Sequence, residues 1–224
     1  MSKNLIKITS IGVGVLFGVY IILRVVGVFQ MYKAEGMSSA PEILPGDWIF
    51  ASNLKEAKGL DHICFEQTYS GFPPGIWIKR LVALEGDKLE LVDGVLFVNG
   101  KNQDKKLNTI HSYWVDTKAL PQIEKITKLE DYFNPMTLGD STMIYIEDKE
   151  VLAYMNAREV SIIGGESYLF QEFNPKWTKN NFGPIIIPKN KGFVLGDNRD
   201  GSIDSRHIGC ISLEQIVGVR FCKN

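Results

Sequence analysis

The chain has 224 residues with a formal net charge of −1, 45% hydrophobic residues and 23% charged residues. This balance excludes a disordered protein and leaves room for one membrane segment plus one sizeable domain, or for two small domains. The near-neutral charge and the lack of a basic stripe with interleaved aromatic residues argue against a nucleic-acid partner. The three cysteines and three histidines have no metal-ligand spacing, so we expect no metal site.

An apolar run occupies residues 8–29 and follows a short segment, residues 1–7, that carries Lys3 and Lys7. At about 1.5 Å per helical residue the run spans roughly 33 Å, enough to cross the hydrocarbon core of a bilayer. A signal peptide has a shorter apolar core of about 7–15 residues. The run therefore predicts a retained transmembrane anchor, with residues 1–7 in the cytoplasm and residues 30–224 outside. A cleaved signal peptide and a buried core helix are the alternatives.

Beyond the apolar run, short segments rich in β-branched and large apolar residues predict strands at residues 48–51, 60–66 and 76–84. An Asp-Gly pair predicts a hairpin with a two-residue turn between residues 89–92 and 95–98. The signal weakens over residues 101–190, which we interpret as an inserted subdomain of mixed β character. Within this region the pattern favours a short amphipathic helix and three strands, at residues 117–133, 151–155, 160–163 and 167–170.

A lysine stands among apolar residues in the segment 76–84. Because side chains alternate along a strand, Trp77, Lys79 and Leu81 are expected to share one face. Such a lysine commonly extends its amine to water at a sheet edge. The alternative is a desolvated amine, whose pKa falls because burial disfavours the charged form. A desolvated amine can act as a general base near neutral pH.

Two polar segments could complete a site around such a lysine. Ser38 and Ser39 lie in a run of small residues after the apolar segment, where a plain linker is the other reading. Residues 196–209 hold five charged groups within ten positions: Asp197, Arg199, Asp200, Asp204 and Arg206. This segment is either a charged surface loop or a buried turn that supports a reactive group.

These three segments, in this order, resemble those of the bacterial type I signal peptidases, membrane-anchored endopeptidases that use a serine and a lysine. The matching residues are 38–41 with 45–47, 78–87, and 196–206, which together make up about an eighth of the chain. The last block is highly specific, the second is good, and the first would be weak alone. Residues 101–190 match only loosely.

The resemblance implies a role for each matching residue. Ser38 would be the nucleophile, its backbone N–H would bind the oxyanion, and Lys79 would be the general base. Ser202 would hydrogen-bond the lysine amine. The turn would be held by an Asp204–Arg206 ion pair, with Asp197 and Arg199 as further supports.

Three positions depart from the family pattern. Ser39 stands where methionine is usual, so it remains an alternative nucleophile. Gly36 stands where many members carry a serine that serves the oxyanion, so a second oxyanion donor would have to come from elsewhere. Gly201 replaces a frequent asparagine, which a tight turn tolerates.

The resemblance also implies the fold and the function. The fold would be all-β, with coiled antiparallel sheets like those of signal peptidases and self-cleaving repressors, plus one N-terminal transmembrane helix. The enzyme would be a monomer at the outer face of the cytoplasmic membrane, in contact with lipid and without cofactor or metal. It would cleave exported preproteins that have small residues at the first and third positions before the cut, bound as an added strand.

Three other functions remain open from the sequence. The first is a dedicated maturation peptidase for a pilin-like or conjugation protein. The second is a catalytically silent, membrane-anchored binding module. The third is a self-cleaving repressor relative, which would need a DNA-binding head and does not fit the N-terminal apolar run.

Overall fold

The computed structural model describes residues 3–125, 135–151, 158–159 and 176–221. The described strands form three sheets, and every pairing between named strands is antiparallel. The largest sheet has the strand order β1 (Gln30–Lys33), β2 (Trp48–Ser52), β15 (Ile216–Arg220), β3 (His62–Gln67), β4 (Gly75–Leu84), β13 (Lys191–Leu195) and β14 (Ile211–Ser212). The predicted antiparallel β class is therefore confirmed.

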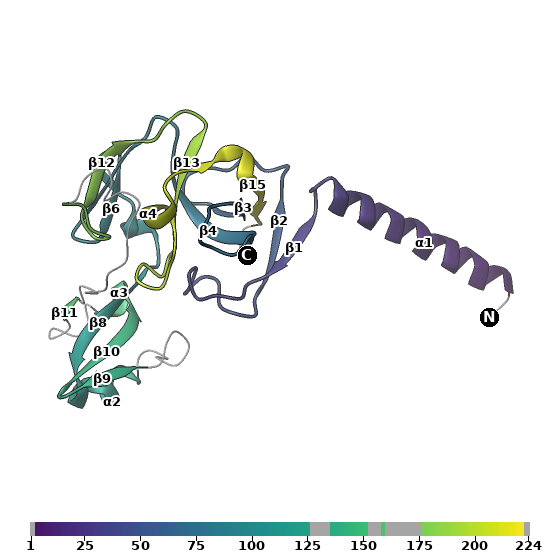
Figure 1. The fold of residues 1–224 in the computed structure, drawn as a ribbon. Helices are drawn as coiled ribbons and strands as arrows, with labels where there is room; N and C mark the ends of the chain where they lie inside the picture. The colour runs from purple at the N-terminus through teal and green to yellow at the C-terminus, as the bar shows by residue number, and fades with distance from the viewer. Residues whose placement is uncertain (1–2, 126–134, 152–157, 160–175, 222–224) are drawn as a thin grey trace.

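Two smaller sheets lie on the side of the first that faces away from α1 (Figure 1). One has the order β12 (Phe182–Ile186), β5 (Lys88–Val92), β6 (Val95–Val98) and β7 (Lys101–Asn102). The other has the order β11 (Arg158–Glu159), β8 (Ile110–Asp116), β10 (Ser141–Glu147) and β9 (Met136–Leu138). After α1, the described helices are single turns: η1 (Asp104–Lys106), η2 (Thr117–Ala119), α2 (Leu120–Ile123), α3 (Asp148–Val151), α4 (Ser205–Ile208) and η5 (Leu213–Gln215).

The predicted strands before residue 100 are present as β2 to β6. The hairpin of β5 and β6 turns at Asp93 and Gly94, whose φ angles are +48° and +81°, as a two-residue turn of this kind requires. Apolar side chains on the inner faces of β4, β5, β6 and β13 form a buried cluster that joins two sheets. This cluster fixes the position of β4 and β13, which flank the site.

The region from 101 to 190 is only partly as predicted. Its most extensive strand pairing, β8 with β10, was not anticipated. The segment 117–133 begins with η2 and α2, and residues 126–134 lie outside the described part. Of the predicted strand 151–155, Val151 ends α3 and the rest lies outside the described residues, as do the predicted strands 160–163 and 167–170.

The N-terminal apolar run is not one continuous helix. α1 (Lys3–Val25) projects from the β body (Figure 1), and Gly27 follows it with a φ of +75°, a conformation that ends a helix. Phe29 then packs on Phe50 of β2, with ring centres 5.9 Å apart. In the described part of the chain, no helix combines the length and the apolarity of a membrane span. The predicted transmembrane anchor over residues 8–29 is therefore not supported.

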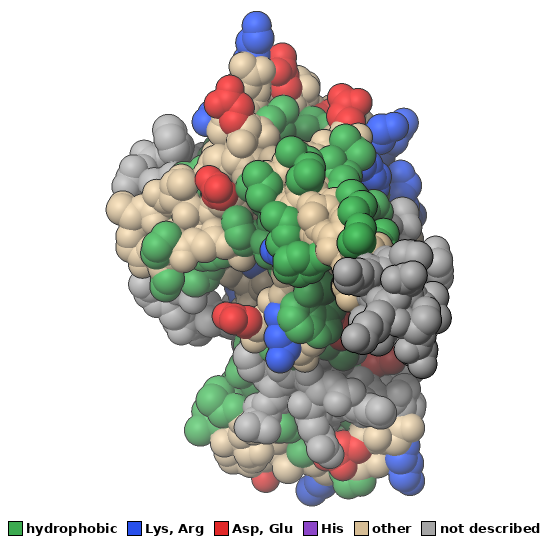
Figure 2. All heavy atoms as spheres, turned by 90° about the vertical axis from the view of Figure 1, so that its right-hand side faces the viewer, with side chains coloured by type: hydrophobic (Ala, Val, Ile, Leu, Met, Phe, Trp, Pro, Cys, Tyr) green, Lys and Arg blue, Asp and Glu red, His purple; other side chains and the backbone are tan. Residues whose placement is uncertain are grey.

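Apolar side chains nevertheless cover the described surface of α1. Figure 2, which faces the side from which α1 projects, shows hydrophobic side chains gathered near the middle of the view. The large exposed side chains of this kind on α1 are Ile11, Val13, Val15, Leu16, Phe17, Val19, Ile21, Ile22, Leu23 and Val25.

Candidate active site

Strand β4 carries Lys79 where one of its two edges is open. β3 pairs with β4 from Gly75 to Arg80, whereas β13 pairs with it only from Arg80 to Leu84. Lys79 is only 6% exposed, and its Nζ lies 5.4 Å from the centre of the Trp77 ring. The lysine therefore does not extend into water. It lies beside the Trp77 ring, directly before the residue at which β13 begins to pair with β4.

Ser38 approaches this lysine from the loop between β1 and β2. Lys79 Nζ donates a hydrogen bond to Ser38 Oγ at 2.5 Å. The loop is anchored by Ile43, which is 1% exposed in a cluster with residues of β2 and β3. The Ser38 carbonyl accepts a hydrogen bond from the backbone N–H of Asn198 at 3.2 Å. The structure thus brings together residues from three distant parts of the chain.

Burial controls the charge of the Lys79 amine. The pKa of Lys79 is lowered from 10.5 to about 8, mainly by desolvation, and the nearby guanidinium of Arg206 acts in the same direction. The carboxylates of Asp204 and Asp197 act in the opposite direction and keep the pKa from falling more. A substantial fraction of the amine is therefore neutral at slightly alkaline pH.

The turn from Gly196 to Gly209 is a buried structure held by ion pairs. Asp204 and Arg206 are 0% and 1% exposed, with Arg206 Nη2 2.9 Å from Asp204 Oδ2 and Arg206 Nε 2.9 Å from Oδ1. Asp204 also caps α4 and accepts a hydrogen bond from the Gly196 N–H at 3.0 Å. Burial alone would raise the pKa of Asp204, but the charge of Arg206 and contacts with His207 outweigh burial and hold that pKa well below its usual range.

Two of the other three charged residues of the turn, Asp197 and Arg199, bind partners outside it. Asp197 accepts hydrogen bonds from Arg80 Nε at 2.7 Å and from Arg80 Nη2 at 2.6 Å. Arg199 donates from Nη1 and Nη2 to Asp104, at 3.1 Å and 2.5 Å. Asp197 thus connects the turn to the residue that follows Lys79, and Arg199 connects it to η1.

Ser202 does not make the predicted hydrogen bond to Lys79. Its hydroxyl is buried and has no hydrogen-bond partner in the part of the chain that the structure describes. Instead, the Ser202 side chain packs on Gly196, where an added Cβ would lie 2.3 Å from Ser202 Oγ and 2.5 Å from the Ser38 carbonyl oxygen. Gly196 lets the turn approach the loop between β1 and β2 (residues 34–47, the serine loop) this closely. Ser202 contributes packing there rather than a bond to the Lys79 amine.

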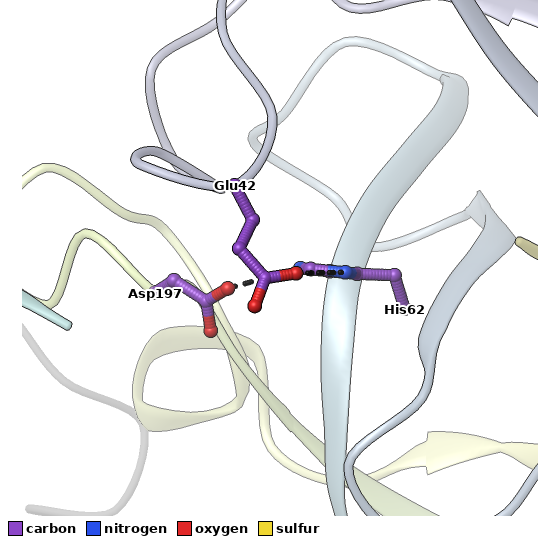
Figure 3. A group of neighbouring side chains, drawn as sticks. All are labelled: Glu42, His62 and Asp197. Carbon is purple, nitrogen blue, oxygen red and sulfur yellow. Dashed lines mark hydrogen bonds and ion pairs between the residues drawn. The ribbon is translucent and has the colours of Figure 1, made fainter. Parts of the chain in front are cut away.

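A cluster of Glu42, His62 and Asp197 lies beside the site and was missed from the sequence (Figure 3). Their potential metal-ligating atoms lie within 4.8 Å of one another. His62 Nε2 is 3.0 Å from Asp197 Oδ2, and Glu42 Oε2 is 3.3 Å from Arg80 Nη2 and 3.7 Å from Arg220 Nη1. Two guanidinium groups thus already neutralise the two carboxylates. We interpret the cluster as an ion-pair network that anchors the serine loop to β4.

The serine and the lysine open onto a cleft of about 600 Å³. Its walls come from the serine loop, from the open part of β4 with the preceding Pro73 and Pro74, and from Gly201 and Ile203 of the turn. The cleft therefore runs along the edge of β4 that β13 leaves unpaired. An extended peptide on this edge would lie beside Ser38 Oγ.

The chain is similar to known signal peptidases. The family model for signal peptidase, peptidase S26, matches residues 4–223. A signal peptidase I from Buchnera aphidicola subsp. Baizongia pistaciae is 26% identical, over 90% of this chain and 72% of the relative. A signal peptidase IB from Staphylococcus aureus strain Mu50 is 28% identical, over 97% of this chain and 88% of the relative.

A crystal structure of a signal peptidase I from Enterococcus faecalis V583 aligns with 74% of this chain and 97% of that chain, at 20% identity and a TM-score of 0.35. The assignment rests on the family model, which extends over nearly the whole sequence and includes the serine loop, β4 and the charged turn. The chain belongs to the signal peptidase family, peptidase S26.

Proposed function

We propose that this chain is a serine endopeptidase that removes signal peptides from exported preproteins, with Ser38 as nucleophile and Lys79 as general base. The observation that carries the proposal is the 2.5 Å contact between Lys79 Nζ and Ser38 Oγ at the floor of an open cleft. A serine hydroxyl is a weak nucleophile until a neighbouring base takes its proton. The lowered pKa of Lys79 makes its amine suited to that task near neutral pH.

The reaction proceeds through an acyl-enzyme. The neutral Lys79 amine takes the hydroxyl proton as Ser38 Oγ attacks the scissile carbonyl carbon, and the ammonium then gives a proton to the leaving amine. The neutral amine next takes a proton from a water molecule, which attacks the ester carbonyl, and the ammonium returns this proton to Ser38 Oγ as the acyl bond breaks. The backbone N–H of Ser38 stabilises the oxyanion. Gly36 provides no side-chain donor, so a second donor comes from elsewhere.

The open edge of β4 determines how the substrate binds. No described strand pairs with residues 75–79 on the edge facing the cleft, where the Ile78 carbonyl is bound by the Ser39 hydroxyl. An extended peptide can add along this edge as a strand. The proposed substrate is a preprotein segment with small residues at the first and third positions before the cut, as in Ala-x-Ala. Trp77 and Ile78 lie in the cleft wall and limit the size of the side chains that fit.

The dedicated maturation peptidase and the silent, membrane-anchored binding module gain no support as alternative functions. The relatives reported above are named as signal peptidase I enzymes, and none carries the name of a dedicated maturation peptidase. A silent binding module would not need a buried amine in contact with a serine hydroxyl. The experiment that separates these functions is cleavage of an Ala-x-Ala preprotein by the full chain in detergent, with the cut site identified by mass spectrometry. If the enzyme left every preprotein intact, the binding-module alternative would replace our proposal.

The pH dependence tests the role of Lys79. Below about pH 8, kcat/KM is expected to fall about tenfold per pH unit, because the pKa of Lys79 is about 8 and only the neutral amine is a base. The unfolded chain binds this proton more tightly, with a pKa of 10.5, so the contribution of Lys79 to stability increases between pH 8 and 10.5. Below pH 8 the folded and the unfolded chain both hold this proton, so the contribution of Lys79 to stability is constant there. The fall in rate below pH 8 is therefore not caused by unfolding through Lys79, which circular dichroism at each pH checks. A flat profile from pH 6 to 9 would contradict the assignment of the base.

We also propose that α1 attaches the chain to lipid, with residues 30–224 at the outer face of the cytoplasmic membrane. The support is the apolar surface of α1, on which large side chains such as Ile11, Leu16 and Val25 are 67%, 71% and 81% exposed. In a flotation assay, the full chain is expected to rise with vesicles of phosphatidylethanolamine and phosphatidylglycerol. A chain without residues 1–26 is expected to remain at the bottom. Equal flotation of both proteins would remove α1 as the attachment.

A further inference from the structure

Ser39, the residue after the nucleophile, is turned away from the reacting atoms. Its side chain is buried, at 4% exposure, and its hydroxyl donates a hydrogen bond to the carbonyl oxygen of Ile78 at 3.0 Å. This hydroxyl therefore bonds to the backbone of β4 rather than to the Lys79 amine. The contact excludes Ser39 from the role of nucleophile in this conformation and gives its hydroxyl a different partner.

This bond closes a small ring around the site. Ser38 and Ser39 are neighbours in the loop, and Ile78 and Lys79 are neighbours in β4. The gap between loop and strand is crossed by two hydrogen bonds, Lys79 Nζ to Ser38 Oγ at 2.5 Å and Ser39 Oγ to the Ile78 carbonyl at 3.0 Å. Two adjacent attachments restrict sliding and rotation of the loop along the strand much more than one attachment would.

The Ile78 carbonyl also needs such a donor. It lies in the part of β4 that β13 does not reach, since that pairing ends at Arg80. A strand carbonyl without a partner is normally satisfied by water or by another chain segment. Here the serine hydroxyl is the partner, and it binds the carbonyl directly before the proposed base.

We propose that Ser39 is a positioning residue that holds Ser38 Oγ and Lys79 Nζ in reactive register by binding the Ile78 carbonyl. This inference rests on the proposed function, because it assigns Ser39 a task in the same reaction. Displacement of reacting groups by about 1 Å can cost on the order of 100-fold in rate. Loss of the hydroxyl should therefore affect the chemical step more than substrate binding, which uses the rest of the cleft.

The test is Ser39→Ala in the full chain, measured with an Ala-x-Ala preprotein. We expect kcat to fall about tenfold while KM stays within about twofold. The acid limb of the pH–kcat profile is expected to move to higher pH, because a loosened loop admits water to the amine and eases its protonation. Ser39→Thr retains a hydroxyl and is expected to recover at least half of the lost kcat.

Ser52→Ala is the matched control. Ser52 is also buried, at 3% exposure, and its hydroxyl also makes one bond to the backbone, with the Leu54 N–H at 3.1 Å, but it lies in β2 outside the cleft. Its kcat and pH profile should equal those of the wild type. Unchanged kcat in Ser39→Ala, or equal losses in both variants, would overturn the positioning role.

The outcomes separate this inference from the proposed function. If the wild type cleaves and Ser38→Ala does not, the function stands whatever Ser39→Ala does. If Ser39→Thr has a clearly lower melting temperature than the wild type, its activity no longer reports on the hydroxyl. The changes in kcat and KM of Ser39→Ala then decide by themselves whether Ser39 is a positioning residue. A loss confined to KM in that variant would assign Ser39 to substrate binding and refute the inference.

Discussion

Ser38→Ala is expected to lower kcat/KM for an Ala-x-Ala preprotein by about 10⁴-fold or more, since no other hydroxyl contacts the Lys79 amine in the described structure. Lys79→Met is expected to cause a loss of similar size, because it removes the base and keeps the apolar length of the side chain. Removing both groups should cost little more than removing either, because the two act as one unit. Quantitative cleavage kinetics with purified variants provide the measurement.

Melting temperatures distinguish lost chemistry from lost structure in these variants. The lowered pKa of Lys79 shows that its charged form is destabilised by burial, so replacement by methionine should leave the melting temperature at pH 7 unchanged or higher. Lys55→Met is the matched control, since Lys55 is partly exposed and pairs with Asp61 away from the cleft. It should cleave like the wild type. Normal cleavage by Ser38→Ala would show that the nucleophile is another residue.

Asp204→Ala is expected to destabilise the fold by about 3–5 kcal/mol, because it leaves the guanidinium of Arg206 buried without its carboxylate. It also removes the acceptor for the Gly196 N–H at 3.0 Å. For a domain of this size the melting temperature should fall by roughly 10 °C. Thermal unfolding followed by circular dichroism measures this change.

The same substitution should also reduce activity below the new melting temperature. Gly196 contacts the Ser38 carbonyl and the Ser202 side chain so closely that a shift of the turn displaces the serine loop. Lys149→Ala is the control, because it breaks an ion pair in which the lysine side chain is 62% exposed, and such pairs contribute at most about 1 kcal/mol. Should Asp204→Ala melt and cleave like the wild type, the turn would be an ordinary charged loop.

Local sequence patterns were informative where the structure depends on neighbours along the chain. The alternation of apolar residues predicted β4 and placed Trp77 and Lys79 on the same face. The Asp-Gly pair predicted the turn between β5 and β6, because positive φ angles at both positions suit those residue types. The predicted helix over residues 8–29 extended too far, because Gly27 ends α1 early.

Partners far apart in sequence could not be read in the same way. Asp197 and Arg199 were expected to support the turn, but their partners, Arg80 and Asp104, lie 117 and 95 positions away. Ser202 was expected to bind the amine, and it packs on Gly196 instead. Which carboxylate meets which guanidinium depends on how the sheets pack, and local periodicity carries no information about that packing.

The sequence by itself thus determined strands β2 to β6, because strand and turn patterns depend on short-range geometry. It identified the serine and the lysine, and the antiparallel class, through the resemblance of three segments to those of the type I signal peptidases. Only the tertiary structure decided that Ser38 rather than Ser39 contacts Lys79, and that the Ser39 hydroxyl binds β4 instead. The two serines are adjacent and chemically identical. Their difference comes from the direction in which the folded loop presents each side chain to the open edge of β4.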